Sequence, residues 1–211
     1  MSSRDTVLAR IRAAIADLPP DPVPIPRTYL RHAPGVADGD RAAVVALMAE
    51  RLDEYGARVR RVDARELPAA VADALDAQGA RSAVVPEGFP REWLARWSGQ
   101  LRPDSPPLPD AELDAIDAVV TTSAAGIAES GTIVLDGGPG QGRRAPTLLP
   151  DIHVCVLRED RIASGLPEVI GELDPRRPLT WFAGPSATAD IEMIRVQGVH
   201  GPRRLTVLIT R

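Results

Sequence analysis

The stretch Gly126-Ile-Ala-Glu-Ser-Gly-Thr-Ile-Val-Leu135 decides how the chain is interpreted, because an acid and a turn lead directly into a continuous apolar strand. It runs on into Gly137-Gly-Pro-Gly-Gln-Gly-Arg-Arg144 and ends at Leu148-Leu-Pro-Asp-Ile-His153, where another apolar run begins. Short continuous apolar strands are typical of parallel sheets that are covered on both faces. This part of the chain therefore predicts neighbouring buried strands joined by a glycine-rich loop.

Helix and strand patterns alternate on both sides of this stretch. Helices are expected at residues 40–56, 66–78, 111–116 and 167–173, with another starting at Pro90. Strands are expected at residues 59–62, 82–86, 118–122, 132–136, 152–157, 179–183 and 204–210. This alternation predicts a three-layer α/β/α fold with a mainly parallel central sheet, in which ligands bind beyond the carboxyl ends of the strands.

The first 36 residues differ from the remainder. Residues 3–17 carry apolar side chains on one helical face, and a proline-rich stretch follows that can continue neither a helix nor a central strand. We interpret residues 1–36 as an amphipathic helix and proline-rich arm, and residues 37–211 as one domain. The arm is expected to pack on its own domain or on a neighbouring subunit, and the pattern favours neither.

Composition narrows the possible functions. The chain has 44% hydrophobic and 26% charged residues, and its apolar runs fall short of the roughly 20 residues that cross a bilayer. No membrane insertion is expected, and without a secretory pattern at the start of the sequence the expected location is cytoplasmic.

All 25 basic residues are arginine, which excludes catalysis by a lysine side chain of this chain. Aromatic residues make up 3%, so nucleic-acid binding is not expected.

The single cysteine, Cys155, lies in an apolar run and is expected to be a buried small hydrophobe. It cannot form an internal disulfide or hold an iron–sulfur cluster by itself. Without the spacing of a metal site or a flavin or nicotinamide fingerprint, the expectation is that this chain binds no cofactor of its own.

The first cluster of candidate site residues surrounds the glycine-rich loop. Glu129 is expected at the sheet edge, where burial would suit it to general acid or base work, although it could equally cap the backbone or pair with an arginine. The loop could present backbone N–H groups to an anion, with Arg143 and Arg144 as bidentate donors. The alternative is a merely mobile hairpin loop.

The second cluster combines Gly184-Pro-Ser-Ala-Thr-Ala-Asp-Ile-Glu192 with Gly198-Val-His-Gly-Pro202. Ser186 or Thr188 is expected to cap a short helix and to contact an anion there, while Asp190 either complements the helix dipole or orients His200. His200 is preferred to His153 as an acid–base group, and His32 is expected to be solvated. The histidine spacing predicts no metal site.

These motifs resemble the lactate-utilization protein C family, whose defining unit is the LUD domain. The resemblance covers nearly the whole chain, with Ser130 where the family usually has threonine; Gly131 and Thr132 complete the motif and are expected to bind the ligand. It implies a NagB/RpiA/CoA-transferase-like fold. It also implies a role in oxidising L-lactate to pyruvate beside two iron–sulfur partner proteins.

The sequence thus supports three hypotheses and leaves open whether this chain is an enzyme. The first is a subunit of an L-lactate oxidation system with a pocket for a small carboxylate or phosphorylated ligand. The second is an assembly subunit that docks iron–sulfur partners through the arm. The third is a stand-alone CoA- or sugar-phosphate-processing enzyme of the same fold, although fold kinship alone does not transfer chemistry.

Overall fold

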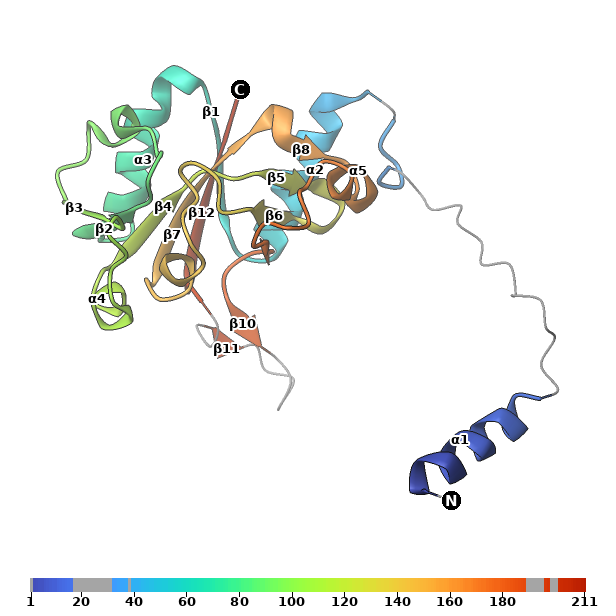
Figure 1. Ribbon diagram of the computed structural model, residues 1–211. Helices are drawn as coiled ribbons and strands as arrows, with labels where there is room; N and C mark the ends of the chain where they lie inside the picture. Colours follow the sequence, from blue (N-terminus) through green and yellow to red (C-terminus); the bar gives the residue numbers. More distant parts are fainter. Residues whose placement is uncertain (1, 17–31, 38, 189–195, 198–200) are drawn as a thin grey trace.

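A six-stranded sheet forms the centre of the computed structural model, which describes residues 2–16, 32–37, 39–188, 196–197 and 201–211 (Figure 1). All neighbouring strands pair in parallel. In spatial order the strands are β1 (Arg58–Val62), β12 (Arg204–Thr210), β7 (Ile152–Arg158), β4 (Ala118–Thr121), β2 (Ser82–Val85) and β3 (Gln100–Pro103). The predicted α/β class with a mainly parallel sheet is confirmed.

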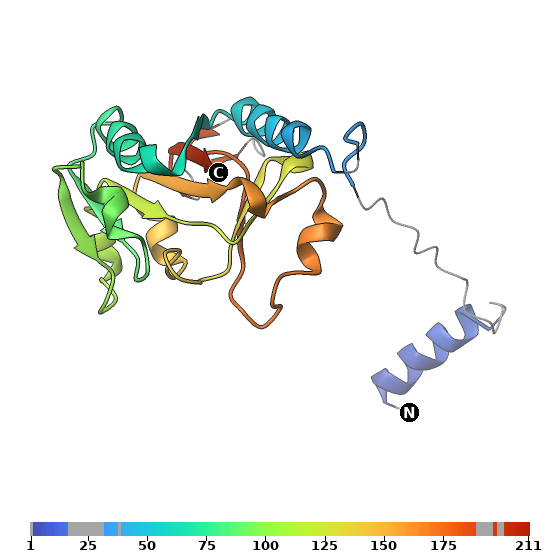
Figure 2. The same cartoon turned by 90° about the horizontal axis from the view of Figure 1, so that it is seen from above.

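The central strands β7 and β12 are apolar on both faces because a layer covers each face. Alternate side chains of a strand point to opposite faces. Val154, Val156 and Leu208 belong to the cluster around α3 (Leu67–Asp76), whereas Cys155 and Leu157 belong to the cluster around α2 (Arg41–Glu54). In Figure 2 the end of β12 lies between α3 and α2. The two helices therefore cover opposite faces of the sheet.

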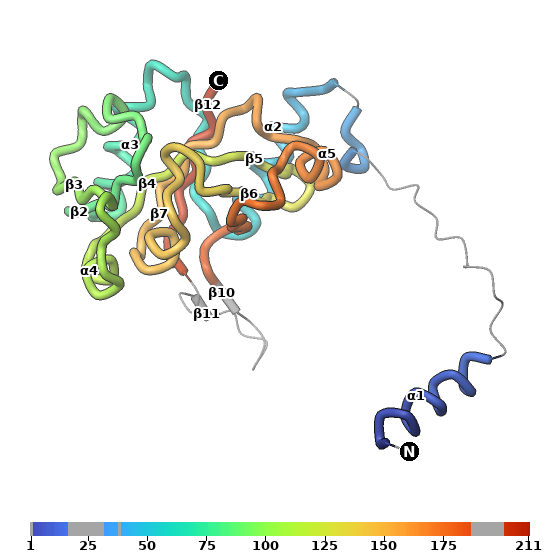
Figure 3. Tube along the Cα trace, in the orientation of Figure 1, coloured from blue at the N-terminus to red at the C-terminus, as the bar shows by residue number. Residues whose placement is uncertain are grey.

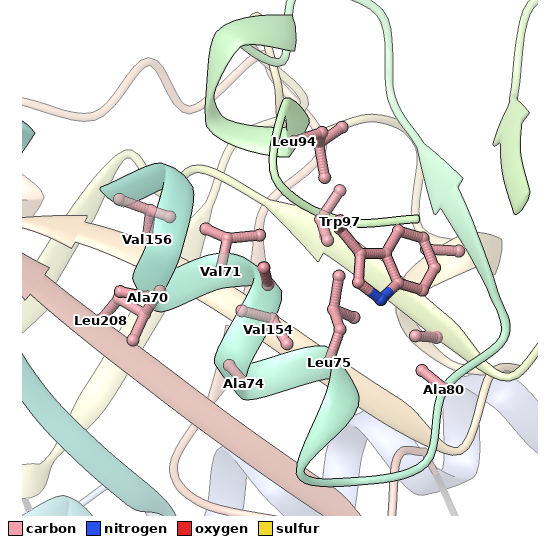
Figure 4. Packing of buried hydrophobic residues seen from close by; sticks show 14 of the residues in the cluster. Ala70, Val71, Ala74, Leu75, Ala80, Leu94, Trp97, Val154, Val156 and Leu208 are labelled. Atoms are coloured by element: carbon pink, nitrogen blue, oxygen red, sulfur yellow. The ribbon is translucent and has the colours of Figure 1, made fainter. Parts of the chain in front are cut away.

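The α3 layer packs through an apolar stripe that meets the sheet and a short segment after β2. Val71, Leu75 and Trp97 point toward one another in Figure 4. The indole Nε1 of Trp97 donates a hydrogen bond to Asp76 Oδ1 at 2.9 Å, so the ring is buried with its polar atom paired. The predicted helix from Pro90 is only a 3-10 turn, η2 (Arg91–Leu94).

The opposite layer combines α2 with a second, four-stranded sheet. Its strands, in spatial order, are β8 (Ile162–Ala163), β5 (Ala125–Ile127), β6 (Thr132–Leu135) and β9 (Thr180–Phe182). The predicted strands at 132–136 and 179–183 therefore exist, but they pair antiparallel with each other outside the central sheet. An apolar run predicts that a strand forms, but it does not indicate which strand it pairs with. The sequence therefore could not assign these strands to one sheet or the other.

The remaining elements are short and connect or flank these layers. They are α1 (Ser3–Ala14), η1 (Ala64–Glu66), α4 (Asp110–Asp114), η3 (Ala128–Ser130), η4 (Ala145–Thr147), η5 (Glu159–Arg161), α5 (Leu166–Ile170), β10 (Ala187–Thr188) and β11 (Val196–Gln197). Figure 3 follows the chain through them. No helix in the described ranges is long and apolar enough to cross a membrane.

The predicted arm divides into two parts. None of the residues of α1 is buried. In contrast, Ala33 is buried and its N–H donates to Ser164 Oγ at 3.2 Å, and Val36 packs against the α2 cluster. His32 Nδ1 lies 3.2 Å from Glu168 Oε1, so His32 has an acidic partner rather than only solvent. The packed part of the chain thus reaches back to His32.

The turn Ala128–Ser130 packs tightly against α2 and explains the glycine that follows it. Gly131 has φ +60°, and a Cβ added there would lie 2.8 Å from Cβ of Arg51. A side chain would therefore meet both backbone strain and a steric overlap. The motif around Glu129 has a structural reason to contain glycine, independent of any ligand.

We predict that Gly131→Ala lowers the free energy of unfolding by about 2–4 kcal/mol, because left-handed strain and overlap with Arg51 add. Gly79→Ala is the matched control: its φ is +74°, but nothing lies within 4 Å of the added Cβ. It should cost only the strain, about 1–2 kcal/mol. Urea unfolding of both variants measures the difference, and equal losses would contradict the packing described for Gly131.

Candidate functional site

A cavity of about 270 Å³ lies at the amino ends of β7 and β12. His153 is the second residue of β7 and Leu205 the second of β12, and both line it. In Figure 1 the amino ends of β7 and β12 lie at the lower end of the sheet. The cavity is therefore at the opposite end from the carboxyl ends at which the sequence predicted a site.

Three separate segments form the walls of this cavity. The loop before β7 contributes Arg144 and Thr147, the segment after β9 contributes Ser186, and Gly201 precedes β12. Ser186 N donates to Pro202 O at 2.9 Å, which ties the last two segments together. The structure thus brings together Arg144 and Ser186, which were both predicted to bind the ligand.

Gly184 allows the segment after β9 to approach α2. Its φ is +77°, and a Cβ there would lie 2.4 Å from Cβ of Tyr55, the C-cap residue of α2. Only glycine fits both the conformation and the contact. The close approach fixes the course of the chain from Gly184 into Ser186.

Arg144 supplies positive charge to the cavity. Its side chain is exposed and forms no ion pair with any residue in the described ranges. A guanidinium group can donate two parallel hydrogen bonds to one carboxylate. Arg144 is therefore available to an anionic ligand.

His153 lines the same cavity as a neutral group. Its side chain is buried, its Nε2 lies 2.7 Å from Thr121 Oγ1, and its ring is tilted against Phe182 at a centroid distance of 5.2 Å. Burial lowers the pKa of His153 to about 4. At neutral pH the imidazole therefore contributes hydrogen bonding and shape, without charge.

Comparisons with known proteins agree with this architecture. A family model described as the LUD domain matches residues 45–210. The chain belongs to the LUD domain family. A lactate utilization protein C of Deinococcus radiodurans is 46% identical over 212 residues, which cover 96% of this chain and 93% of that protein. One of Halalkalibacterium halodurans is 36% identical over 101 residues, 44% of each chain.

A solved structure is also similar to this LUD domain. The crystal structure of a DUF162 family protein from Deinococcus radiodurans aligns with a TM-score of 0.69 at 42% sequence identity. The alignment covers 81% of this chain and 98% of that chain. The fold is thus shared over most of the LUD domain.

Arg143 points away from the cavity despite being adjacent to Arg144. Its Nε and one terminal nitrogen donate to the carboxylate of Asp104 at 2.9 and 3.0 Å, and it also donates to Leu108 O. These interactions raise the pKa of Arg143, the hydrogen bond to Asp104 most strongly. The two arginines, predicted as a pair of ligand donors, have different roles in the LUD domain.

The glycine-rich loop is a packed element of the LUD domain. Gly140 N donates to Glu87 O at 2.7 Å, Gly138 N donates to Asp136 Oδ1, and the buried Gln141 accepts from Asp136 N. Several backbone donors expected to face an anion are thus already paired. The sequence offered two interpretations of this loop, backbone N–H groups open to an anion and a mobile hairpin loop. Neither included the hydrogen bonds that pack the loop against its neighbours.

Glu129 lies in η3 and its side chain is exposed, so the predicted burial of this acid is wrong. Strand β6 pairs with β9 through Ile133 and Phe182, which places the motif beside the segment that leads to Ser186. Glu129, Gly131 and Thr132 nevertheless do not line the cavity. Ser130 Oγ and Thr132 Oγ1 lie 2.7 Å apart and bond to each other.

Two predicted site residues, Asp190 and His200, lie outside the described residues. Thr188 ends the two-residue strand β10, which pairs with β11, where a helix cap was predicted. Residues 187–188 are thus in a strand and not in the first turn of a helix. Gly201, which follows His200 in the sequence, lines the cavity, and a Cβ on it would lie 3.6 Å from Cβ of Ser186.

Sequence reasoning undervalued His153 and missed Thr147 and Phe182. His153 stands inside an apolar run, which signals burial beside a core strand, but the pairing with Thr121 depends on the β4–β7 register. Thr147 and Phe182 carry no motif. In the part of the LUD domain that the structure describes, no group of three or more acidic, histidine or cysteine residues could hold a metal ion.

We predict that His153 makes stability fall on acidification. Its pKa of about 4 in the folded protein lies below the usual 6.5, so its contribution is fully present above pH 6.5 and is lost as the pH falls toward 4. Between pH 7 and 5 this is about 2 kcal/mol of unfolding free energy.

Urea unfolding at the two pH values checks this, with His153→Gln as the comparison because glutamine can still hydrogen bond but does not titrate. The variant should lose about 2 kcal/mol less than the unmodified protein between pH 7 and 5. An equal pH dependence of both proteins would show that His153 does not titrate as described.

Proposed function

We propose that this protein serves in L-lactate utilization, as a subunit of a system that oxidises L-lactate to pyruvate. The observation that carries the proposal is the 46% identity to a lactate utilization protein C over 96% of this chain. Because the match spans nearly the full length of both chains, it includes the loop before β7 and the segments after β9 and before β12 that form the cavity.

The cavity is suited to a small carboxylate. At about 270 Å³ it has room for a molecule of the size of lactate or pyruvate. Arg144 would bind the carboxylate and the hydroxyl of Ser186 would donate or accept a hydrogen bond. Neutral His153 would add a polar surface without adding a second charge.

We place acid–base work on His200 within this proposal. Its neighbour in the sequence, Gly201, lines the cavity, and a Cβ added to Gly201 would lie 3.6 Å from Cβ of Ser186. Removing a proton from the hydroxyl of lactate suits a group that titrates near neutral pH. Asp190 is the proposed partner that would orient it.

The two electrons released from lactate would leave through iron–sulfur clusters in partner proteins. The chemistry of Cys155 supports placing the clusters in partner proteins, since Cys155 is the single cysteine of this chain. Burial raises the pKa of its thiol to about 12, whereas cluster ligands are thiolates. This chain would then hold the carboxylate while its partners accept the electrons.

We predict that L-lactate and pyruvate bind to the purified protein and that Arg144→Gln weakens this binding about tenfold or more, because a charge-assisted pair is lost. Isothermal titration calorimetry measures the affinities. Arg60→Gln is the matched control, since Arg60 is an exposed arginine on the edge strand β1 and pairs with Asp73 of α3. Equal losses in both variants, or no binding to any of the proteins, would contradict the proposed pocket.

The exposed face of α1 favours a second candidate, an assembly subunit. Val7, Ile11 and Ile15 recur at helical spacing and are each about half exposed, at 54%, 50% and 51%. Deleting residues 1–16 should abolish co-purification with iron–sulfur partners while lactate binding persists. Retaining residues from His32 onward keeps the packing of Ala33 intact. Unchanged co-purification would remove this candidate.

A further inference from the structure

A second and larger cavity, of about 860 Å³, opens at the carboxyl ends of the central strands. Segments at the ends of five strands line it: Ala64 follows β1, Pro90 follows β2, Thr122 follows β4, Arg158 ends β7 and Thr210 ends β12. In Figure 1 this is the upper end of the sheet, where the chain reaches its C-terminal residue. Open α/β sheets bind ligands at this edge.

One wall of this carboxyl-edge cavity is positively charged. Arg158, Arg161, Arg177 and Arg211 line it, against the carboxylates of Asp136 and Glu172. The lining thus has four positive and two negative side chains. Three of the arginines already have acidic partners, since Arg158 pairs with Asp160, Arg177 with Asp136 and Arg211 with Glu159. Arg161 forms no ion pair within the described part of the chain.

Another part of the lining is apolar and aromatic. Leu67, Pro90 and Trp93 line it, and Trp93 is half-buried. The ring of Phe89 meets the ring of Trp93 edge-on, with centroids 5.5 Å apart at 90°. This contact fixes the orientation of the indole, which can stack on a planar ring of a ligand.

The cavity floor is held in place by hydrogen bonds. Ser123 Oγ donates to Val156 O at 3.1 Å, and Thr122 Oγ1 donates to Pro139 O at 2.9 Å. The glycine-rich loop closes one side, because Gly138, Pro139 and Gln141 also line the cavity. A loop whose backbone is already paired costs little further ordering when a ligand binds.

We propose that the carboxyl-edge cavity binds a nucleotide, with its phosphates on Arg158 and Arg161 and its base on Trp93. Arginine side chains and a planar aromatic side chain in one cavity match a ligand that is polyanionic at one end and a flat ring at the other. Arginine suits phosphate because its donors form a planar fork. The volume exceeds what a small carboxylate needs and is separate from the lactate cavity at the amino ends.

The test uses calorimetric titration of the full chain with ADP, with pyrophosphate and with adenosine. ADP should bind more tightly than either of the others, because only ADP offers both phosphates for the arginines and a base for Trp93. The double variant Arg158→Gln/Arg161→Gln should weaken ADP and pyrophosphate about tenfold or more. Arg60→Gln, the matched loss of an exposed arginine, should change neither beyond about twofold.

Trp93→Leu separates a nucleotide from a simple phosphate ligand. It should weaken ADP about tenfold, since stacking on a base is worth on the order of 1–3 kcal/mol, and leave pyrophosphate within about twofold. The two exposed arginines can be replaced without disturbing the core, so their variant remains decisive if Trp93→Leu does not fold.

Three results would overturn the assignment: no ADP binding at millimolar concentration, equal ADP affinity in the double arginine variant, or pyrophosphate binding as tightly as ADP. Arg144→Gln distinguishes this proposal from the lactate pocket, because it should leave ADP binding unchanged. ADP binding without lactate binding would support the carboxyl-edge site alone.

Discussion

The parallel ladder between β7 and β12 is the constraint on which the remaining structure depends. Both strands are buried along nearly their whole length, and their backbone groups find partners in each other and in β1 and β4. Strands buried on both faces need a cover on each, which α3 provides on one side and α2 with the small sheet on the other. The two cavities follow from this, because the covers leave only the two ends of the ladder accessible.

The two ends of the sheet differ in chemistry. At the amino ends, Arg144 and Ser186 meet a neutral, buried His153 in a small space. At the carboxyl ends, several arginines and Trp93 line a larger one. A division of ligands between the ends would let one chain bind a small carboxylate and a nucleotide at once, without competition for the same groups.

Local sequence patterns predicted the fold class, but they did not predict which strands or side chains pair with each other. The apolar runs at residues 152–157 and 204–210 identified the central strands because burial on both faces leaves a continuous signal. The run at 132–136 carries the same signal although β6 pairs with β9 outside the central sheet. Among the candidate site residues, Arg144 and Ser186 line the same cavity, whereas Arg143 turns to Asp104, a carboxylate 39 positions away that no motif connects to it. Glu129 and Gly131 form a motif whose glycine is explained by contact with Arg51, so a dense motif here reflects packing at least as much as chemistry.

A crystal structure of the protein grown with L-lactate would show whether the cavity at the amino ends of β7 and β12 is a carboxylate site. We expect lactate in that cavity, with its carboxylate at about 2.7–2.9 Å from guanidinium nitrogens of Arg144 and its hydroxyl near Ser186. Lactate bound only at the carboxyl ends of the strands, or an empty cavity at saturating lactate, would contradict it.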